Sequence, residues 1–150
     1  MKKHTRLVYV SHAAYAFTAD QLTRLAHKSV ARNAERGVTG MLLYSAGHFM
    51  QCLEGDDSVV ALTYKRVASD SRHTAVTTLA LEAAEKRLFA QWSMGLLNLD
   101  AAGVAELDRA RLLHAVHKAR RAKGAAAADA VALLKDFRQQ LPAGGTPQAA

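Results

Sequence analysis

The clearest pattern of apolar and polar positions lies in residues 37–55, GVTGMLLYSAGHFMQCLEG. Two short apolar runs flank the dipeptide Ala46-Gly47, which predicts a tight β-hairpin. Gln51 interrupts the second run. A buried side-chain amide has to satisfy two donors and an acceptor, or it destabilises the fold. Gln51 therefore bonds either neighbouring backbone groups or a polar ligand inside the fold, and this stretch alone leaves both interpretations open.

A first β-strand is predicted from the segment TRLVYVS near the N-terminus. Leu7, Tyr9 and Ser11 fall on one face of this strand, and Val8 and Val10 fall on the other. Because both faces are largely apolar, we expect the strand to be central in a sheet.

The next element is a helix, for which Thr18 is the expected N-cap and Gln21 completes a capping box. The periodicity carries the helix to about Asn33. Leu25, Ser29 and Asn33 are spaced i, i+4 and i+8, so a core-facing stripe ends in two polar side chains. That stripe is expected to face a polar group.

A second helix is predicted over about 58–69, after the capping sequence Asp56-Asp57-Ser58. The charged segment DSRHTAV, residues 70–76, is expected to be a loop. The buried face of the helix is predicted to hold Val59, Leu62, Thr63 and Val67.

Two further strands are predicted over 76–85 and 88–97. In the second of these, Trp92, Met94 and Leu96 are expected to share one face. The order βαββαββ predicts an α/β fold of the α+β type: a ferredoxin-like mixed sheet with two helices on one face.

The composition changes from about residue 101. A basic helix is predicted over 102–121, Gly124 breaks it, and an Ala-rich helix follows over 125–141. This helix hairpin is expected to cover the second face of the sheet, where Val8, Val10, Met50 and Cys52 would otherwise lie bare. The apolar side of the last helix is predicted to consist of Ala130, Leu133, Leu134, Phe137 and Leu141.

Composition narrows the class of protein. The chain has 150 residues, half of them apolar, which suits one domain with a short appendage. No apolar run is long enough to span a membrane, and the segment MKKHTRLVYV is too short for a signal peptide. The single cysteine, Cys52, excludes an internal disulfide and favours a cytoplasmic protein. The net charge of +7 permits an acidic partner without defining one.

Several polar side chains are predicted to converge on the face covered by the first two helices. Tyr9 and Gln51 point there from two strands, Asn33 reaches it from the first helix, and residues 70–73 border it. Each has a structural alternative, such as a core tyrosine or a solvated loop group. Together they provide phenol, amide, guanidinium and imidazole groups between apolar helices, which suits a planar heteroaromatic ligand. No metal site is expected.

In these residues the sequence resembles the BLUF domains, a family of flavin-binding blue-light sensors. The matching segments are LVYVS (7–11), RNAERGVTGMLLYSAGHFMQCLEG (32–55), DSRH (70–73) and FAQWSMG (89–95). The resemblance covers about residues 5–98. It implies a photosensor domain over 1–98, a two-helix extension over 99–141 and a disordered tail over 142–150.

The resemblance also implies roles for individual residues. Tyr9 matches the photoactive tyrosine, Gln51 the glutamine between that tyrosine and the flavin, and Asn33 the asparagine at the carbonyl edge of the ring. Trp92 and Met94 match a mobile pair on the last strand, with Ser29 as their polar neighbour. The remaining cofactor-binding residues that it implies are Leu25, Leu42, Phe49, Arg66 (toward the phosphates), Val67, Asp70, Arg72 and His73.

The implied function is that of a cytoplasmic blue-light photoreceptor without an attached catalytic domain. FAD is the implied cofactor, although the ring-binding residues do not separate it from FMN or riboflavin. Light would drive electron and proton transfer with Tyr9 and rearrange the hydrogen bonds of Gln51, giving a red-shifted state. The implied partners are an unidentified signalling protein and further copies of the chain.

Two other functions fit parts of the sequence. An acylphosphatase-like enzyme would need a Gly-rich phosphate loop after the first strand, but this place holds HAAYAFTAD. A nucleic-acid-binding module could use the basic helix over residues 109–123, which has six Lys or Arg, two His and no acidic residue. A solvated helix face is the simpler interpretation of that charge.

Overall fold

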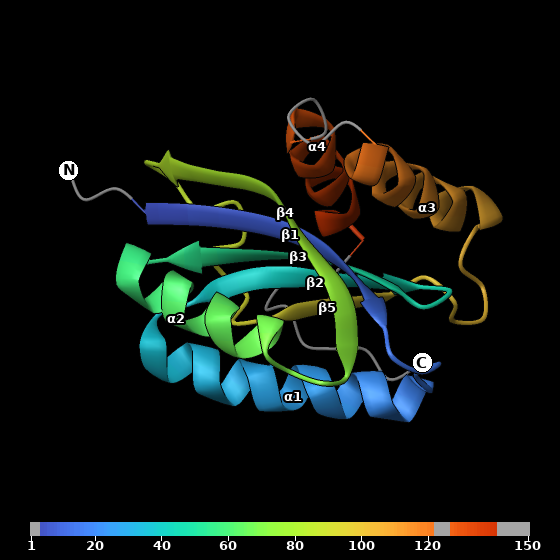
Figure 1. The fold of residues 1–150 in the computed structure, drawn as a ribbon, viewed down its shortest axis with the longest axis horizontal. Helices are drawn as coiled ribbons and strands as arrows, with labels where there is room; N and C mark the ends of the chain where they lie inside the picture. Colours follow the sequence, from blue (N-terminus) through green and yellow to red (C-terminus); the bar gives the residue numbers. More distant parts are fainter. Residues whose placement is uncertain (1–3, 122–126, 141–150) are drawn as a thin grey trace.

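The computed structural model describes residues 4–121 and 127–140. The chain follows the predicted order βαββαββ and continues into two helices (Figure 1). The elements are β1 (His4–Ala13), α1 (Ala19–Arg36), β2 (Thr39–Ser45), β3 (His48–Gly55), α2 (Asp57–Ala68), β4 (His73–Ala84), β5 (Gly95–Asn98), α3 (Glu106–Arg121) and α4 (Ala127–Arg138).

The five strands form one mixed sheet in the order β4-β1-β3-β2-β5. β2 and β5 are parallel, whereas β1 is antiparallel to both β3 and β4, and β2 is antiparallel to β3. α1 and α2 cover one face of the sheet, and α3 and α4 cover the other (Figure 1). The predicted α+β class is confirmed, with β1 inside the sheet and β3 in its centre.

The hairpin between β2 and β3 turns at Ala46 and Gly47, as predicted. Both residues have positive φ, 48° and 80°, which is the backbone of a type I′ turn. The turn brings Leu42 directly opposite Gln51. The register of the hairpin therefore decides which side chains surround that glutamine.

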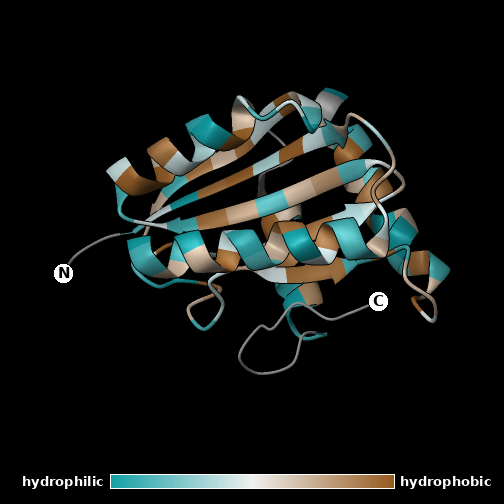
Figure 2. Ribbon diagram, turned by 90° about the horizontal axis from the view of Figure 1, so that it is seen from below, coloured by the Kyte–Doolittle hydropathy of each residue, from teal (hydrophilic) through white to brown (hydrophobic). Residues whose placement is uncertain are grey.

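α1 has recognisable capping residues at both ends. Thr18 accepts a hydrogen bond from the backbone nitrogen of Gln21, and the Gln21 side chain accepts one from the Thr18 backbone, so the capping box is confirmed. The helix extends to Arg36, three residues beyond the predicted end, and Gly37 follows in the left-handed conformation. Figure 2 looks onto α1 and α2 and shows hydrophilic and hydrophobic segments alternating along both helices.

α2 differs from the prediction in its phase. Val60 is its buried residue, while Val59, Thr63 and Val67 are half-buried and Leu62 is 50% exposed. Leu62 lies two residues from Val60, which places it about 200° around the helix and away from the sheet. The expected burial of Leu62 is therefore wrong.

Two apolar cores lie on the two faces of the sheet, and β1 contributes to both. Leu7 and Tyr9 pack toward α1 and α2, whereas Val8 and Val10 pack toward α3 and α4, so the predicted alternation is confirmed. The core beneath α3 and α4 also contains Met50, Cys52, Ala130, Leu133, Leu134 and Phe137. The predicted covering of the second face is thus confirmed, while Gly124, Leu141 and the tail over 142–150 lie outside the described residues.

The last strand is shorter than predicted. Only Gly95–Asn98 pair with β2, and residues 88–94 form turns. Because this segment is not extended, the side chains do not alternate: Trp92 packs in the core beneath α3 and α4, whereas Met94 and Leu96 pack on the opposite face. The prediction that these three share one face is wrong.

β4 begins earlier than predicted, at His73, because His73 pairs with Ala13 at the end of β1. The predicted loop over 70–76 is therefore reduced to a turn before the strand. None of the described helices has the length and apolarity needed to cross a membrane.

Candidate functional site

A cleft lies between α1 and α2, with β1, β2 and β3 contributing to its floor. About 590 Å³ of it is not filled by atoms, part of that open to solvent. The residues that line it are Tyr9, Phe17, Leu25, Ser29, Arg32, Leu42, Phe49, Gln51, Arg66, Val67, Asp70, Arg72 and His73. Most of the predicted cofactor-binding residues are thus brought together here.

A smaller hollow continues the cleft along α1. It shares Ser29, Gln51 and Arg66 with the main cleft and adds Asn33 at its wall. Asn33 is buried, and its side-chain nitrogen donates to the carbonyl oxygen of Ser93 at 2.8 Å. Asn33 therefore ties α1 to the segment that leads into β5.

Tyr9 and Gln51 form the buried polar pair in the floor of the cleft. They lie directly opposite each other on β1 and β3, and the Tyr9 hydroxyl donates a hydrogen bond to the Gln51 side-chain oxygen. The Gln51 side-chain nitrogen donates to the sulfur of Met94 at 3.3 Å. The amide is thus bonded to two side chains, which replaces the interpretation in which it bonds neighbouring backbone.

The environment of Tyr9 keeps its phenol neutral. Burial raises its pKa well above the ordinary value of about 10, and the neighbouring Tyr64 and Asp70 raise it further. The ring of Tyr64 lies 5.5 Å from that of Tyr9, centroid to centroid. The Tyr9 hydroxyl is therefore a proton donor throughout the physiological range.

Residues 70–73 form one wall of the cleft. The Arg72 Nε atom lies 3.0 Å from both carboxylate oxygens of Asp70, and these hydrogen bonds hold the pKa of Asp70 down to about 2. His73 contacts the Ser11 hydroxyl at 2.9 Å with one ring nitrogen and the Val67 carbonyl with the other. This turn therefore links the end of α2 to β1.

Ser29 and Trp92 do not meet as the resemblance implied. The Ser29 hydroxyl donates to the Leu25 carbonyl one turn earlier in α1. Trp92 is 7% exposed, stacks on Phe89 at 5.9 Å and lies in the core on the other side of the sheet. Its indole nitrogen has no hydrogen-bond partner among the described residues. The structure brings Met94, and not Trp92, to Gln51.

Three lining residues were not found from the sequence. Arg32 and Arg36 follow Ser29 at helical spacing and join Arg66 at the cleft, which makes its rim strongly positive. Phe17, just before α1, packs edge-on against Phe49 at 5.3 Å. The helical spacing was a signal for the two arginines, whereas Phe17 lies in an irregular segment that carries none.

A buried phenol and amide, apolar walls and an arginine-rich rim suit a planar polar ring with an attached anionic group. A family model described as "BLUF: Sensors of blue-light using FAD" matches residues 5–95, well over half of the chain, and the chain belongs to this family. The resemblance stated from the sequence is confirmed. This family consists of blue-light sensors, and FAD is the cofactor that its description names.

Relatives of known function contain this domain within longer chains. The chain is 35% identical over 91 residues to the photoactivated adenylate cyclase subunit beta-like protein FB of Euglena gracilis, covering 60% of this chain and 11% of that protein. It is 32% identical over 95 residues to the blue light- and temperature-regulated antirepressor BluF of Escherichia coli, covering 63% and 24%. The chain thus spans only a fraction of these relatives.

Solved structures agree in fold. The dark-state structure of the BLUF protein BlrB matches with a TM-score of 0.70 at 26% identity, over 93% of this chain and 98% of that one. A bacterial light-regulated adenylyl cyclase matches with a TM-score of 0.70 at 30% identity, over 79% and 35%. These comparisons give no support to the nucleic-acid-binding alternative.

Proposed function

We propose that the cleft between α1 and α2 holds the isoalloxazine ring of FAD and that Tyr9 and Gln51 are the photoactive pair. The observation that carries this proposal is the continuous chain of hydrogen bonds from Tyr9 through Gln51 to Met94 in the floor of the cleft. A core tyrosine and glutamine would need only local partners. Here both are aligned across two strands in the floor of a cleft lined by apolar and charged side chains.

The lining of the cleft fits the cofactor. Leu25, Leu42, Phe49 and Val67 offer apolar contacts to the faces of a flat ring, and Asn33 and Gln51 offer amides to its polar edge. Asp70, Arg72 and His73 close the cleft on the side of β4. Arg32, Arg36 and Arg66 are placed to meet the phosphates, because guanidinium groups bind phosphate oxygens in a bidentate manner.

Bound FAD supplies blue-light absorption and a strongly oxidising excited state. Tyr9 is the residue that gives up an electron and a proton, since its neutral phenol already donates to the Gln51 oxygen. Gln51 is the relay, because its amide presents an acceptor at one end and a donor at the other. Rotation or tautomerisation of that amide exchanges its hydrogen-bond partners and forms no covalent bond to the cofactor.

The signal is proposed to leave through Met94 and β5. We assign the Gln51–Met94 hydrogen bond to the dark state. Exchange of the Gln51 partners removes that bond and releases Met94, one residue before β5. α3 and α4 pack on the opposite face of the same sheet and are the proposed contact for a downstream protein or a second copy of the chain.

The proposed path of the signal assigns a separate role to each segment of the chain. Residues 1–98 sense light, and residues 99–141 form the output extension. The output is then the binding of a signalling protein rather than catalysis by this chain. A cytoplasmic location suits the single free thiol, Cys52, which is buried and whose pKa is raised by burial.

The test compares full-length wild-type protein with Gln51→Leu and with the control Gln140→Leu, which changes an exposed glutamine beyond α4. All three are expected to bind FAD, which is identified by chromatography after release from the protein. A reversible red shift in blue light is expected for wild type and control but not for Gln51→Leu. A normal shift in Gln51→Leu would remove Gln51 from the switch.

A further inference from the structure

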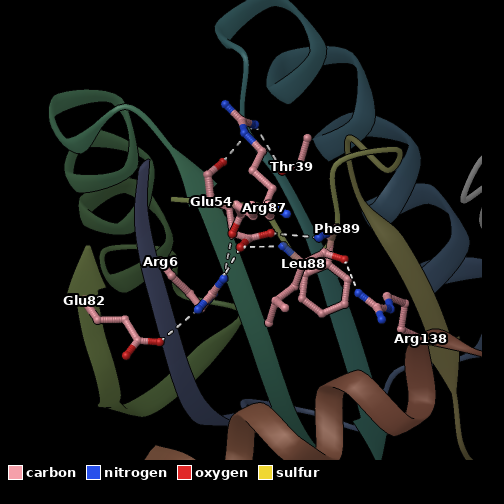
Figure 3. A network of polar contacts seen from close by, with 9 residues as sticks. Arg6, Thr39, Glu54, Glu82, Arg87, Leu88, Phe89 and Arg138 are labelled. Carbon is pink, nitrogen blue, oxygen red and sulfur yellow. Dashed lines mark hydrogen bonds and ion pairs between the residues drawn. The ribbon is translucent and has the colours of Figure 1, made fainter. Parts of the chain in front are cut away.

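Glu54 is a buried carboxylate that the flavin site does not use. It is 1% exposed and lies three residues after Gln51 on β3, so its side chain points to the opposite face of the sheet. The carboxylate accepts three hydrogen bonds: from Arg6 Nε at 3.0 Å and from the backbone nitrogens of Leu88 and Phe89 at 2.9 Å each (Figure 3). It therefore anchors the connection between β4 and β5 at Leu88 and Phe89.

The charge of Glu54 is balanced by a row across three strands. Arg6 on β1 lies opposite Glu54 on β3 and opposite Glu82 on β4, and it forms ion pairs with both (Figure 3). Arg6 also donates to the Lys86 carbonyl at 3.0 Å. A buried ion pair adds little net stability compared with well-packed apolar side chains. What this one adds is a fixed position for Leu88 and Phe89.

The segment over 88–94 is held at further points along its length. The backbone nitrogen of Gly40 donates to the Trp92 carbonyl at 3.0 Å, and the Asn33 side chain donates to the Ser93 carbonyl. Phe89 stacks on Trp92. The segment then ends at Met94, whose sulfur accepts the hydrogen bond from Gln51. Glu54 and Gln51 thus hold the two ends of one short, non-repetitive stretch of chain.

The same stretch contacts the output helices. The Leu88 backbone nitrogen donates to Glu54, while the Leu88 carbonyl accepts a hydrogen bond from Arg138 of α4 at 2.7 Å (Figure 3). One residue therefore bridges the buried carboxylate of the sheet and the end of α4. A displacement of Leu88 changes both contacts at once.

We propose that Glu54 is a positioning residue of the photosensor, which holds the segment over 88–94 so that Met94 lies in place to receive Gln51. This rests on the proposed function, because it takes the Gln51–Met94 bond as part of the dark state. Recovery after light requires that bond to form again. With Glu54 in place, the segment over 88–94 is restricted, so Met94 returns to the position from which it accepts the hydrogen bond of Gln51. Without Glu54, Met94 samples a broader set of conformations before that bond forms again.

The test measures the full-length, FAD-loaded protein as wild type, Glu54→Gln and Glu54→Asp. The Gln amide has one acceptor atom where three donors converge and turns its NH₂ group toward one of them. Glu54→Gln is expected to show a red shift but to recover in darkness about five-fold more slowly than wild type. Glu54→Asp keeps the carboxylate, and its rate of dark recovery is expected to lie between those of wild type and Glu54→Gln.

The matched control is Glu82→Gln, which removes the other carboxylate partner of Arg6, whereas the backbone nitrogens of Leu88 and Phe89 donate to Glu54 and not to Glu82. Its recovery rate is expected to equal that of wild type. A second readout is independent of photochemistry: amide hydrogen exchange in darkness, which is expected to rise in the peptide over 86–95 of Glu54→Gln and not in β1. A role in stability alone would lower the unfolding temperature of Glu54→Gln without changing recovery.

Arg138→Met keeps the proposal testable if Glu54→Gln does not fold, since it frees the Leu88 carbonyl and leaves the buried pair intact. It is expected to slow recovery in the same direction. Unchanged recovery in a folded Glu54→Gln, or in Arg138→Met where Glu54→Gln is unfolded, would overturn the positioning role. Gln51→Leu separates the two proposals, because a persistent red shift there contradicts the photoswitch itself, whatever Glu54 does.

Discussion

The side-chain nitrogen of Gln51 lies 3.3 Å from the sulfur of Met94 and donates a hydrogen bond to it, while the oxygen of the same amide is held by Tyr9. A thioether is a weak acceptor, whereas the phenol is a strong donor. The amide is therefore held firmly at one end and loosely at the other. This asymmetry lets Gln51 release its nitrogen at small cost when its partners change.

Met94→Leu tests the weak end of that amide. Leucine has about the same volume as methionine but accepts no hydrogen bond, so the fold and FAD binding are expected to persist. The red shift should remain, because Tyr9 and Gln51 are unchanged, while dark recovery slows by about five-fold, equivalent to about 1 kcal/mol. The measurement is recovery of absorption after blue light. The control is Met41→Leu, a change in the core on the other face of the sheet. Equal rates of dark recovery in the two variants would contradict the assignment of the Gln51–Met94 hydrogen bond to the dark state.

Phe137→Ala tests whether α4 is part of the folded core. Phe137 is completely buried beneath α4, so the truncation is expected to lower the free energy of unfolding by about 3–5 kcal/mol. The control is Leu107→Ala on α3, where the side chain is 71% exposed and the expected change is within about 0.5 kcal/mol. Urea unfolding measures both. Equal, small effects would mean that α4 does not cover the sheet in solution.

Asp70→Asn tests the ion pair beside the cleft. The pKa of Asp70 is held down to about 2 by Arg72, below its ordinary value of 3.8. A depressed pKa contributes stability that is complete above about pH 4 and is lost as the pH falls toward about 2. Wild type is therefore expected to be more stable than Asp70→Asn at neutral pH and to lose that advantage over this range. Urea unfolding as a function of pH measures the difference in the free energy of unfolding between wild type and Asp70→Asn. A difference that persists at about pH 2 would show that it does not come from the ionised Asp70 carboxylate.

The basic stretch over 109–123 is expected to bind DNA only weakly. Arg109 donates to the carbonyls of Leu99 and Val104 in the segment before α3, and Arg111 and Lys118 form ion pairs with Asp136 and Asp129 of α4. Arg111 and Lys118 are thus paired with acidic side chains of α4, and Arg109 is engaged with backbone, so these three cations do not form a free stripe for phosphates. Fluorescence anisotropy with duplex DNA should show affinity that falls steeply with salt and does not depend on sequence. Nanomolar, sequence-selective binding at physiological salt would restore the nucleic-acid alternative.

Local chemistry made much of the fold predictable. The capping box at Thr18, the turn at Ala46-Gly47 and the alternation in β1 each depend on neighbours a few residues apart, and all three are confirmed. The same alternation placed Tyr9 and Gln51 on one face. Their direct pairing depends on the register between β1 and β3, which the sequence pattern leaves undetermined.

The error in the last strand lies where distant groups decide the backbone. Residues 88–94 are predicted as a strand because they are largely apolar. Their backbone instead donates hydrogen bonds to the Glu54 carboxylate and accepts one from the Gly40 backbone nitrogen, and these bonds hold the segment in turns. Trp92 consequently lies in the other core from Met94. No local pattern indicates that the carboxylate of Glu54 will bind backbone 34 and 35 residues further along the chain.

A close approach also became visible only in the structure. A Cβ atom on Gly40 would lie 1.9 Å from the Cys52 carbonyl oxygen of the neighbouring strand and 3.4 Å from the Met94 methyl group. Glycine is therefore needed where β2 passes beneath Met94. The sequence showed a glycine at the start of an apolar run, which by itself indicates only a strand boundary.

The most direct test of the photoswitch is the light-minus-dark absorption spectrum of Tyr9→Phe, measured on full-length protein at the same FAD occupancy as wild type. Phenylalanine keeps the buried ring but has no hydroxyl to donate to Gln51, and it is much harder to oxidise. Tyr15→Phe, which changes a tyrosine that is 47% exposed, is the control and should respond as wild type does. We expect Tyr9→Phe to fold, bind FAD and show no persistent red shift; a normal red shift in this variant would contradict the role of Tyr9 as the electron and proton donor.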